Sequence, residues 1–275
     1  MDLGTGLAIF GVTKALEKVL EPSAEVIGQE LKDATQWGIN NIKKIGKNFN
    51  KKVKQKFLTG EEQLNPRVLK VVLQEGAKSD NELMAEYFGG VLASSLSEVS
   101  RDDRGASFAA LVGRLTTYQI RAHYIFYNAV KTLFDGRTDV SLINSKNRNR
   151  LEVFLPSDSF KVAMAFSEKE NVSVILPSVM SGLARENLIE RDFEIIGGEK
   201  TARCGGNGIV FCPTDLGTEL FLWVHGKGDI PIIEFLKPEH KFEFDSEIQL
   251  PQNYKSVYTI LEQQGKFSER IKPEF

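Results

Sequence analysis

Apolar residues recur every three or four positions through most of the first half of the chain, which is the spacing of one face of an α-helix. The pattern predicts four helical stretches, the first with a kink or second start at Pro22 and the last with a break near 115–117. They cover residues 5–32, 34–58, about 81–97 and 108–134. Thr59 and Ser79, each followed by glutamate three positions later, predict helix starts by a capping box. The first half is therefore expected to be helical throughout.

The clearest amphipathic pattern lies in residues 34–58. At 100° per residue its apolar side chains fall within about 120° of arc. They are Ile39, Ile42, Ile45, Phe49, Val53 and Phe57. Lys52 and Lys56 interrupt this stripe, while five lysines lie on the opposite side of the helix. These five, which we call the lysine face, are Lys43, Lys44, Lys47, Lys51 and Lys54.

The pattern changes after the polar stretch 144–149. Helices are predicted at 157–166, about 174–188, 214–224 (capped by Thr214 or Asp215) and 254–263. Strands are predicted at 191–196 and 208–212, with further β-like pieces at 230–236 and 241–244. The order helix, strand, glycine-rich turn, strand resembles a small winged-helix unit whose wing is 197–207.

These patterns predict a mainly α fold, with a helical N-terminal half followed by a winged-helix-like α+β C-terminal half. Three segments are expected. They are 1–60 with the basic amphipathic helix, 61–143 as a helical domain, and 144–275 as the winged-helix-like domain with a C-terminal extension.

Charge is distributed unevenly along the chain, although the net charge is only −2. The three stretches 1–60, 61–135 and 136–275 carry +4, −2 and −4. No acidic residue occurs between Asp33 and Glu61, and seven lysines lie there. The composition therefore excludes a uniformly basic nucleic-acid binder but leaves a local basic contact open.

Two cysteines, Cys204 and Cys212, are too few for a disulfide scaffold, and we expect both to be idle or buried thiols. The apolar run 7–12 lacks a basic segment before it and is far shorter than the roughly 20 residues of a membrane span. The expected location is cytoplasmic, with a peripheral position on the inner face of the membrane as the alternative.

No motif supports catalysis, so a non-enzyme without cofactor or metal is expected. The three histidines lack the spacing of a helical zinc pair, and His123 is interpreted as a structural histidine. Asp245, Glu247 and Lys255 are residue types that also form the metal site of some nucleases, but a chance cluster on the surface is the favoured interpretation. A hidden nuclease remains a third hypothesis.

The lysine face has three physical uses. It can remain in water while the apolar stripe packs in the core, lie on an anionic membrane, or contact nucleic acid or a protein. The winged-helix-like unit is a poor DNA reader, because its candidate recognition helix 177–188 carries only Arg185, offset by Glu186. A protein-contacting or structural role is favoured for that unit.

Several segments resemble the Abi-alpha family, bacterial proteins linked to abortive infection and phage resistance. Residues 19–33 are similar to its Pro-x-Ala-x-x-x-Gly-x-x-Leu-x-Asp segment, and Tyr87-Phe-Gly replaces Trp-Ala in its Trp-Ala-x-Leu-Leu-Ala pattern. Further similar segments are 64–69, Glu75 with 80–83, 107–116, 183–189 and 214–221. The resemblance spans about 5–225 and identifies the chain as a divergent member.

This resemblance implies antiviral defence, with no catalytic residue to carry over. The leading hypothesis is a non-enzymatic anti-phage protein that binds a membrane surface or a protein partner, such as a phage component, through the lysine face. The alternative is a nucleic-acid-binding regulator that uses the same lysines with the winged-helix-like unit. A second copy of the chain is a further candidate partner.

Overall fold

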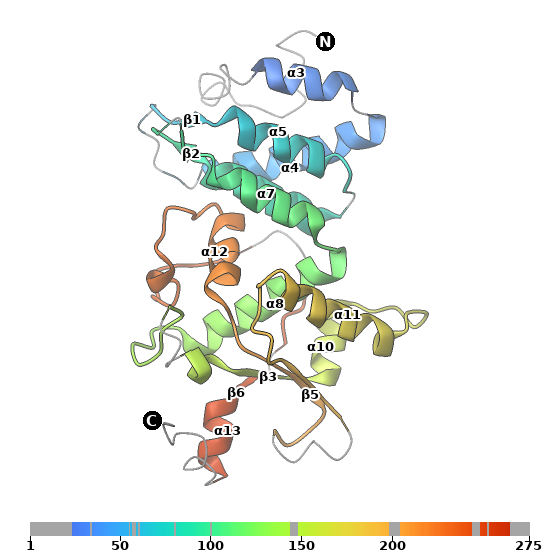
Figure 1. Ribbon diagram of the computed structural model, residues 1–275, viewed down its shortest axis with the longest axis vertical. Helices are drawn as coiled ribbons and strands as arrows, with labels where there is room; N and C mark the ends of the chain where they lie inside the picture. Colours follow the sequence, from blue (N-terminus) through green and yellow to red (C-terminus); the bar gives the residue numbers. More distant parts are fainter. Residues whose placement is uncertain are drawn as a thin grey trace. The chain divides into compact units, whose positions relative to one another are not determined.

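The computed structural model describes residues 24–33, 35–54, 56, 59, 61–79, 81–99, 101–143, 148–197, 204–243, 248–251 and 253–264. These residues are mostly helical, with a few short antiparallel strands (Figure 1), which confirms the mainly α prediction. The chain forms two compact units. The first contains Met1–Ile120, Leu220–Ile230 and Glu243–Ser246, and the second contains Arg121–Glu219, Pro231–Phe242 and Glu247–Phe275. The three segments 1–60, 61–143 and 144–275 remain a prediction.

The first unit is built from helices. They are α3 (Ala24–Asp33), α4 (Gln36–Val53), α5 (Pro66–Gly76), α6 (Glu82–Ser94) and α7 (Arg104–Arg114). Two short strands, β1 (Gln63–Leu64) and β2 (Leu96–Ser97), pair antiparallel. Helix α8 (Thr117–Phe134) begins in this unit and continues into the second, whereas α12 (Asp215–Val224) begins in the second and ends in the first.

Side-chain caps start three of these helices. The Thr35 hydroxyl accepts from Gly38 N at 3.2 Å before α4, and the Asn65 and Asn81 side chains cap α5 and α6 in the same way. The capping boxes predicted at Thr59 and Ser79 are wrong. The Glu62 carboxylate does accept from Thr59 N at 2.8 Å, but a strand follows it. The next helix instead starts at Pro66, with Asn65 as its N-cap. Proline suits the first position of a helix because the backbone N–H there has no hydrogen-bond partner within the helix, and proline has no N–H.

The centre of the first unit is the contact between α4 and α6. Ile42, Ile45, Phe49 and Val53 of the predicted apolar stripe are at most 3% exposed, so this side of α4 is core. Gly89 of α6 lets the two backbones approach closely. A Cβ placed on Gly89 would lie 2.7 Å from Asn48 Cβ, 2.8 Å from Phe49 N and 3.0 Å from Ile45 O.

Gly90, the next residue of α6, allows a similarly close backbone contact with the end of α12. A Cβ on Gly90 would lie 1.7 Å from the Val224 carbonyl oxygen, so the end of α12 packs directly on the α6 backbone. The Ser94 hydroxyl donates to the Trp223 carbonyl at 2.7 Å. The Trp223 ring stacks on Phe108 of α7 with centroids 4.7 Å apart. Residues 220–230 thus complete a core whose other elements lie more than 100 positions earlier in the chain.

The second unit combines helices with one small sheet. Its elements are α10 (Ser157–Met164), α11 (Val172–Arg185), α13 (Val257–Gln263), β3 (Val153–Pro156), β4 (Glu194–Ile196), β5 (Gly208–Phe211) and β6 (Lys255–Ser256), with the 3₁₀ turns η2 (Asn149–Leu151) and η4 (Ile232–Glu234). The strand order is β4-β5-β3-β6, antiparallel throughout. The predicted strands at 191–196 and 208–212 are therefore present, and shorter.

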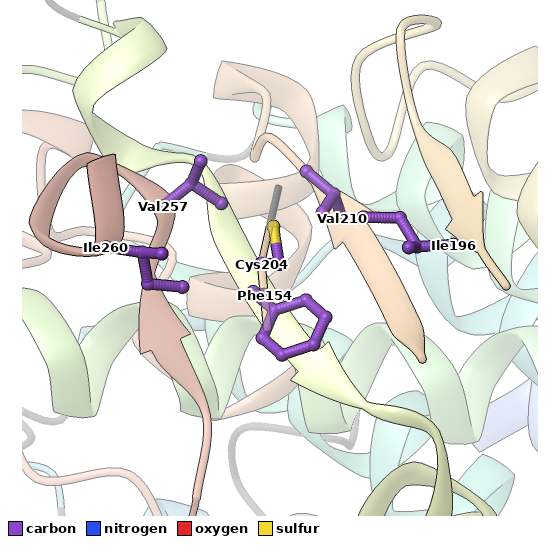
Figure 2. Close-up of a cluster of buried hydrophobic side chains, with 6 residues drawn as sticks. All are labelled: Phe154, Ile196, Cys204, Val210, Val257 and Ile260. Carbon is purple, nitrogen blue, oxygen red and sulfur yellow. The ribbon is translucent and has the colours of Figure 1, made fainter. Parts of the chain in front are cut away.

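One side of this sheet is covered by an apolar cluster (Figure 2). Phe154, Val210 and Ile196 come from β3, β5 and β4, while Val257 and Ile260 come from α13. The Cys204 side chain, 5% exposed, lies among them. The final helix predicted at 254–263 is thus confirmed from Val257 onward, and it is held to the sheet by apolar packing.

Of the predicted boundaries between elements, one is confirmed and others need correction. The break near 115–117 is confirmed, since α7 ends at Arg114 and α8 begins at Thr117. The residue types of Asp102-Asp103-Arg104-Gly105 predict a loop, but only the first two residues precede the helix, because α7 already begins at Arg104. The β-like piece at 230–236 is wrong as well. Pro231 lacks an N–H for a strand ladder, and η4 follows it.

Some predictions fall outside the described residues or fail to form strands. Residues 5–23 of the first predicted helix, together with Phe57 and Leu58, lie outside the described residues. The described part of the piece at 241–244, which is 241–243, carries no strand.

The Gly89 contact predicts a specific loss of stability. Gly89→Ala should lower the free energy of unfolding by about 1–3 kcal/mol, because the new methyl group overpacks against the α4 backbone. Gly28→Ala on α3 is the matched control, since nothing lies within 4 Å of a Cβ there. That control should be neutral or gain up to about 1 kcal/mol from helix propensity. Urea unfolding curves measure both, and equal effects would contradict the close contact.

Candidate contact surface on helix α4

The lysine face lies on the outside of the first unit. Lys43, Lys47, Lys51 and Lys54 are exposed, and Lys44 is half-buried. Five residues at these positions span about 100° of arc on a regular helix. Lys44 Nζ lies 2.5 Å from Glu82 Oε1 on α6. All five predicted residues are therefore brought together on one face.

The other side of α4 explains the two lysines that interrupted the stripe. Lys52 is 7% exposed, and a Cβ placed on Gly226 would lie 3.3 Å from the Lys52 Cβ. Lys56 Nζ lies 3.7 Å from Asp229 Oδ1, and burial lowers the pKa of this amine against the raising effect of that carboxylate. Lys52 thus lies on the inner side of α4 next to Gly226, and Lys56, which follows the end of the helix, lies next to Asp229. Sequence periodicity alone did not reveal that role, because a charged residue carries no apolar signal.

The first turn of α4 adds an aromatic side chain to this surface. Trp37 is 48% exposed and stands seven residues, about two helical turns, before Lys44. It therefore continues the lysine face toward the N-terminus of the helix. Trp37 also borders a shallow groove shared with Leu73, Gln74 and Ala77 at the end of α5. The Gln74 side chain donates to Glu30 Oε1 of α3 at 3.0 Å along this groove.

A buried polar network in the second unit is the strongest candidate for chemistry apart from α4. The Tyr127 hydroxyl donates to the Leu188 carbonyl at 2.7 Å and accepts from Thr214 N at 3.0 Å. The Thr214 hydroxyl accepts from Gly217 N at 3.0 Å, so Thr214, one of the two predicted candidates, is the N-cap of α12. His123 Nε2 donates to the Gly217 carbonyl at 3.0 Å. These groups satisfy backbone atoms at a helix start, which is a structural task.

Those of the remaining candidate residues that the structure describes show no shared site. Cys204 and Cys212 are free thiols, and burial raises the pKa of Cys212 to about 12, so it is not a reactive thiolate. Within the described residues, no group of three or more His, Cys, Asp or Glu side chains is arranged to hold a metal ion. Asp245 and Glu247 of the nuclease-like grouping lie outside the described residues.

No protein-family model matches the chain, and no curated protein or solved structure is significantly similar to it. The Abi-alpha resemblance therefore remains a prediction from sequence motifs. In the part of the chain that the structure describes, no helix combines the length and the apolar character needed to cross a bilayer.

The buried His123 predicts a dependence of stability on pH. Burial lowers the pKa of His123 from 6.5 to about 4. Between these two pH values the imidazole is protonated in the unfolded chain and neutral in the folded protein. The stabilisation is complete above about pH 6.5 and is lost as the pH falls toward 4, by roughly 3 kcal/mol in total.

His123→Gln should flatten this part of the profile, because glutamine keeps a donor for the Gly217 carbonyl without titrating. Urea unfolding of both proteins at several pH values between 4 and 7 measures the difference. Parallel profiles, or an imidazole that titrates near 6.5 by NMR, would contradict the buried neutral ring.

Proposed function

We propose that the protein is a non-enzymatic antiviral defence protein of the abortive-infection type, and that it acts by binding through the lysine face of α4. One observation carries this proposal. Five lysines lie together on the outer face of a helix that has no acidic residue of its own, while the opposite face is core. The Abi-alpha motifs support the biological role, and the lysine face supports the mode of action.

The packing of α4 also supports a contact surface that is ready before the partner arrives. The helix is capped by Thr35, and Ile42, Ile45, Phe49 and Val53 fix it in the core, so binding needs no folding of the helix. A preformed surface loses less conformational freedom on binding than a segment that must first become ordered. The expected partner is therefore anionic and is recognised mainly by charge.

We further infer a winged-helix-like arrangement in the second unit. Its support is the order strand, helix, helix, strand, strand in β3-α10-α11-β4-β5, with β5 between β3 and β4 in the sheet. The exposed side of α11 carries Val174, Pro177, Ser178 and Ser181, and its single basic residue, Arg185, lies 3.6 Å from Glu186. Phosphate contacts need several basic groups, so this surface favours a protein-contacting or structural role over DNA binding.

The main test is reversal of the lysine face. Changing Lys43, Lys44, Lys47, Lys51 and Lys54 to Glu should abolish protection of bacterial cells against phage, because the surface would then repel its partner. The matched control changes five exposed lysines elsewhere, which are Lys70, Lys161, Lys169, Lys241 and Lys255. Plaque counts measure protection, and circular dichroism with thermal unfolding shows that both variants fold. Full protection by the α4 variant would refute the proposal.

The alternative, a nucleic-acid-binding regulator, makes a different prediction for the same residues. Gel-shift titrations with duplex DNA and RNA should then show binding that weakens steeply with salt, because each phosphate contact releases counterions. A lysine face of five residues implies a log–log slope of about −4 to −5 on duplex DNA. No shift at low salt would exclude this alternative.

A further inference from the structure

We propose that the lysine face and Trp37 together form a peripheral docking surface for an anionic phospholipid bilayer. The inference rests on the proposed function, and it names the partner of the same surface. Four observations support it: the geometry of the five lysines, the type of cation, the exposed tryptophan and the burial of the apolar stripe.

The geometry suits a flat partner. The lysine face occupies one arc of the helix, and Lys43 to Lys54 span about 16 Å along its axis. A plane that touches one of these side chains can therefore approach all of them. Attraction to an anionic surface acts within roughly a Debye length, about 8 Å at physiological salt, so the five charges act together.

The type of cation favours lipid over protein or nucleic acid. All five positions are lysine, a strongly hydrated point charge, and α4 contains no arginine. Arginine is the residue that pairs bidentately with phosphate or carboxylate, and lysine is depleted in protein–protein interfaces. Mobile anionic headgroups can rearrange around point charges, so they require no forked donor. The lysine-only face therefore matches a fluid anionic surface.

Trp37 supplies what the lysines lack. Tryptophan concentrates at the interface between water and lipid because its ring is apolar and its indole N–H is polar. Trp37 is 48% exposed on the same side of α4, whereas Ile42, Ile45, Phe49 and Val53 are held in the core. Docking is thus shallow, since one aromatic ring reaches the interface while the apolar stripe stays inside the protein.

The chain provides its own fluorescent reporter for this docking. Only two tryptophans are present, and Trp223 is 1% exposed in the core of the first unit. Transfer of Trp37 into a lipid interface should shift the emission of the full chain to shorter wavelength and expose it to brominated lipids. Trp37→Phe should abolish both signals while the lysines still hold the protein on the vesicle.

The deciding experiment is co-sedimentation of the full chain with phosphatidylglycerol–phosphatidylcholine vesicles and with phosphatidylcholine vesicles alone, at several salt concentrations. Binding is expected only to the anionic vesicles, without leakage of their contents, and should weaken with salt. Each Lys→Gln change at the exposed positions Lys43, Lys47, Lys51 and Lys54 should weaken partitioning about fivefold. The same change at Lys70 or Lys161 should leave it unaltered.

Equal binding to both vesicle types, no binding at low salt, or binding that survives the five α4 changes would overturn the inference. Binding to duplex RNA or DNA in the absence of vesicle binding would overturn it as well. The two proposals fail separately. If the α4 variant loses protection but wild type ignores vesicles, only the lipid partner is wrong. If vesicle binding depends on the lysines but protection does not, the docking surface stands and the defence role falls.

Discussion

The backbone contact between α4 and α6 at Gly89 determines which side of α4 meets water. Any side chain at this position would collide with the main chain of α4, so the glycine sets the distance at which the two helices pack. At that distance Ile42, Ile45, Phe49 and Val53 reach the core. The lysine face lies on the opposite side of α4, where Lys43, Lys47, Lys51 and Lys54 are exposed to water. The orientation of the candidate surface therefore depends on the contact between α4 and α6 at Gly89.

The same principle explains how the chain closes its first unit. Gly90 admits the Val224 carbonyl, and a Cβ on Gly105 would lie 2.1 Å from the Ser95 hydroxyl oxygen and 3.1 Å from the Trp223 ring. Two glycines in helices, Gly90 and Gly105, thus allow residues 220–230 to dock on segments more than 100 positions away. Close packing leaves no space for an additional methyl group at such points. Their cost in helix propensity, up to about 1 kcal/mol each, is offset by the apolar area that the approach buries.

Much of the fold was predictable because it follows from local periodicity. Helix α4, which is shorter than the predicted 34–58, its buried residues and its lysine face follow from the 3.6-residue repeat. Side-chain chemistry limited the cap of α12 to Thr214 or Asp215, and Thr214 is the cap. The close contacts were not predictable, because a glycine gives no apolar signal and its neighbour lies far away in the chain. Lys52 and Lys56 were visible only as interruptions of the stripe. Their place beside residues 226–229 depends on non-local packing that no pattern within 34–58 records.

Burial of the stripe also decides how α4 can meet a membrane. An isolated basic amphipathic helix would insert its apolar face among the lipid chains. Here, insertion would first detach Ile42, Ile45, Phe49 and Val53 from the core, where each buried side chain contributes about 1.5–3 kcal/mol. Lipid would restore that burial for α4, but it would leave the matching surface of α6 exposed to water. The exposed surface would cost an amount comparable to the whole stability of a domain, about 5–15 kcal/mol. If α4 docks on a membrane as proposed, charge together with the exposed Trp37 ring is therefore the means of contact that leaves the fold intact.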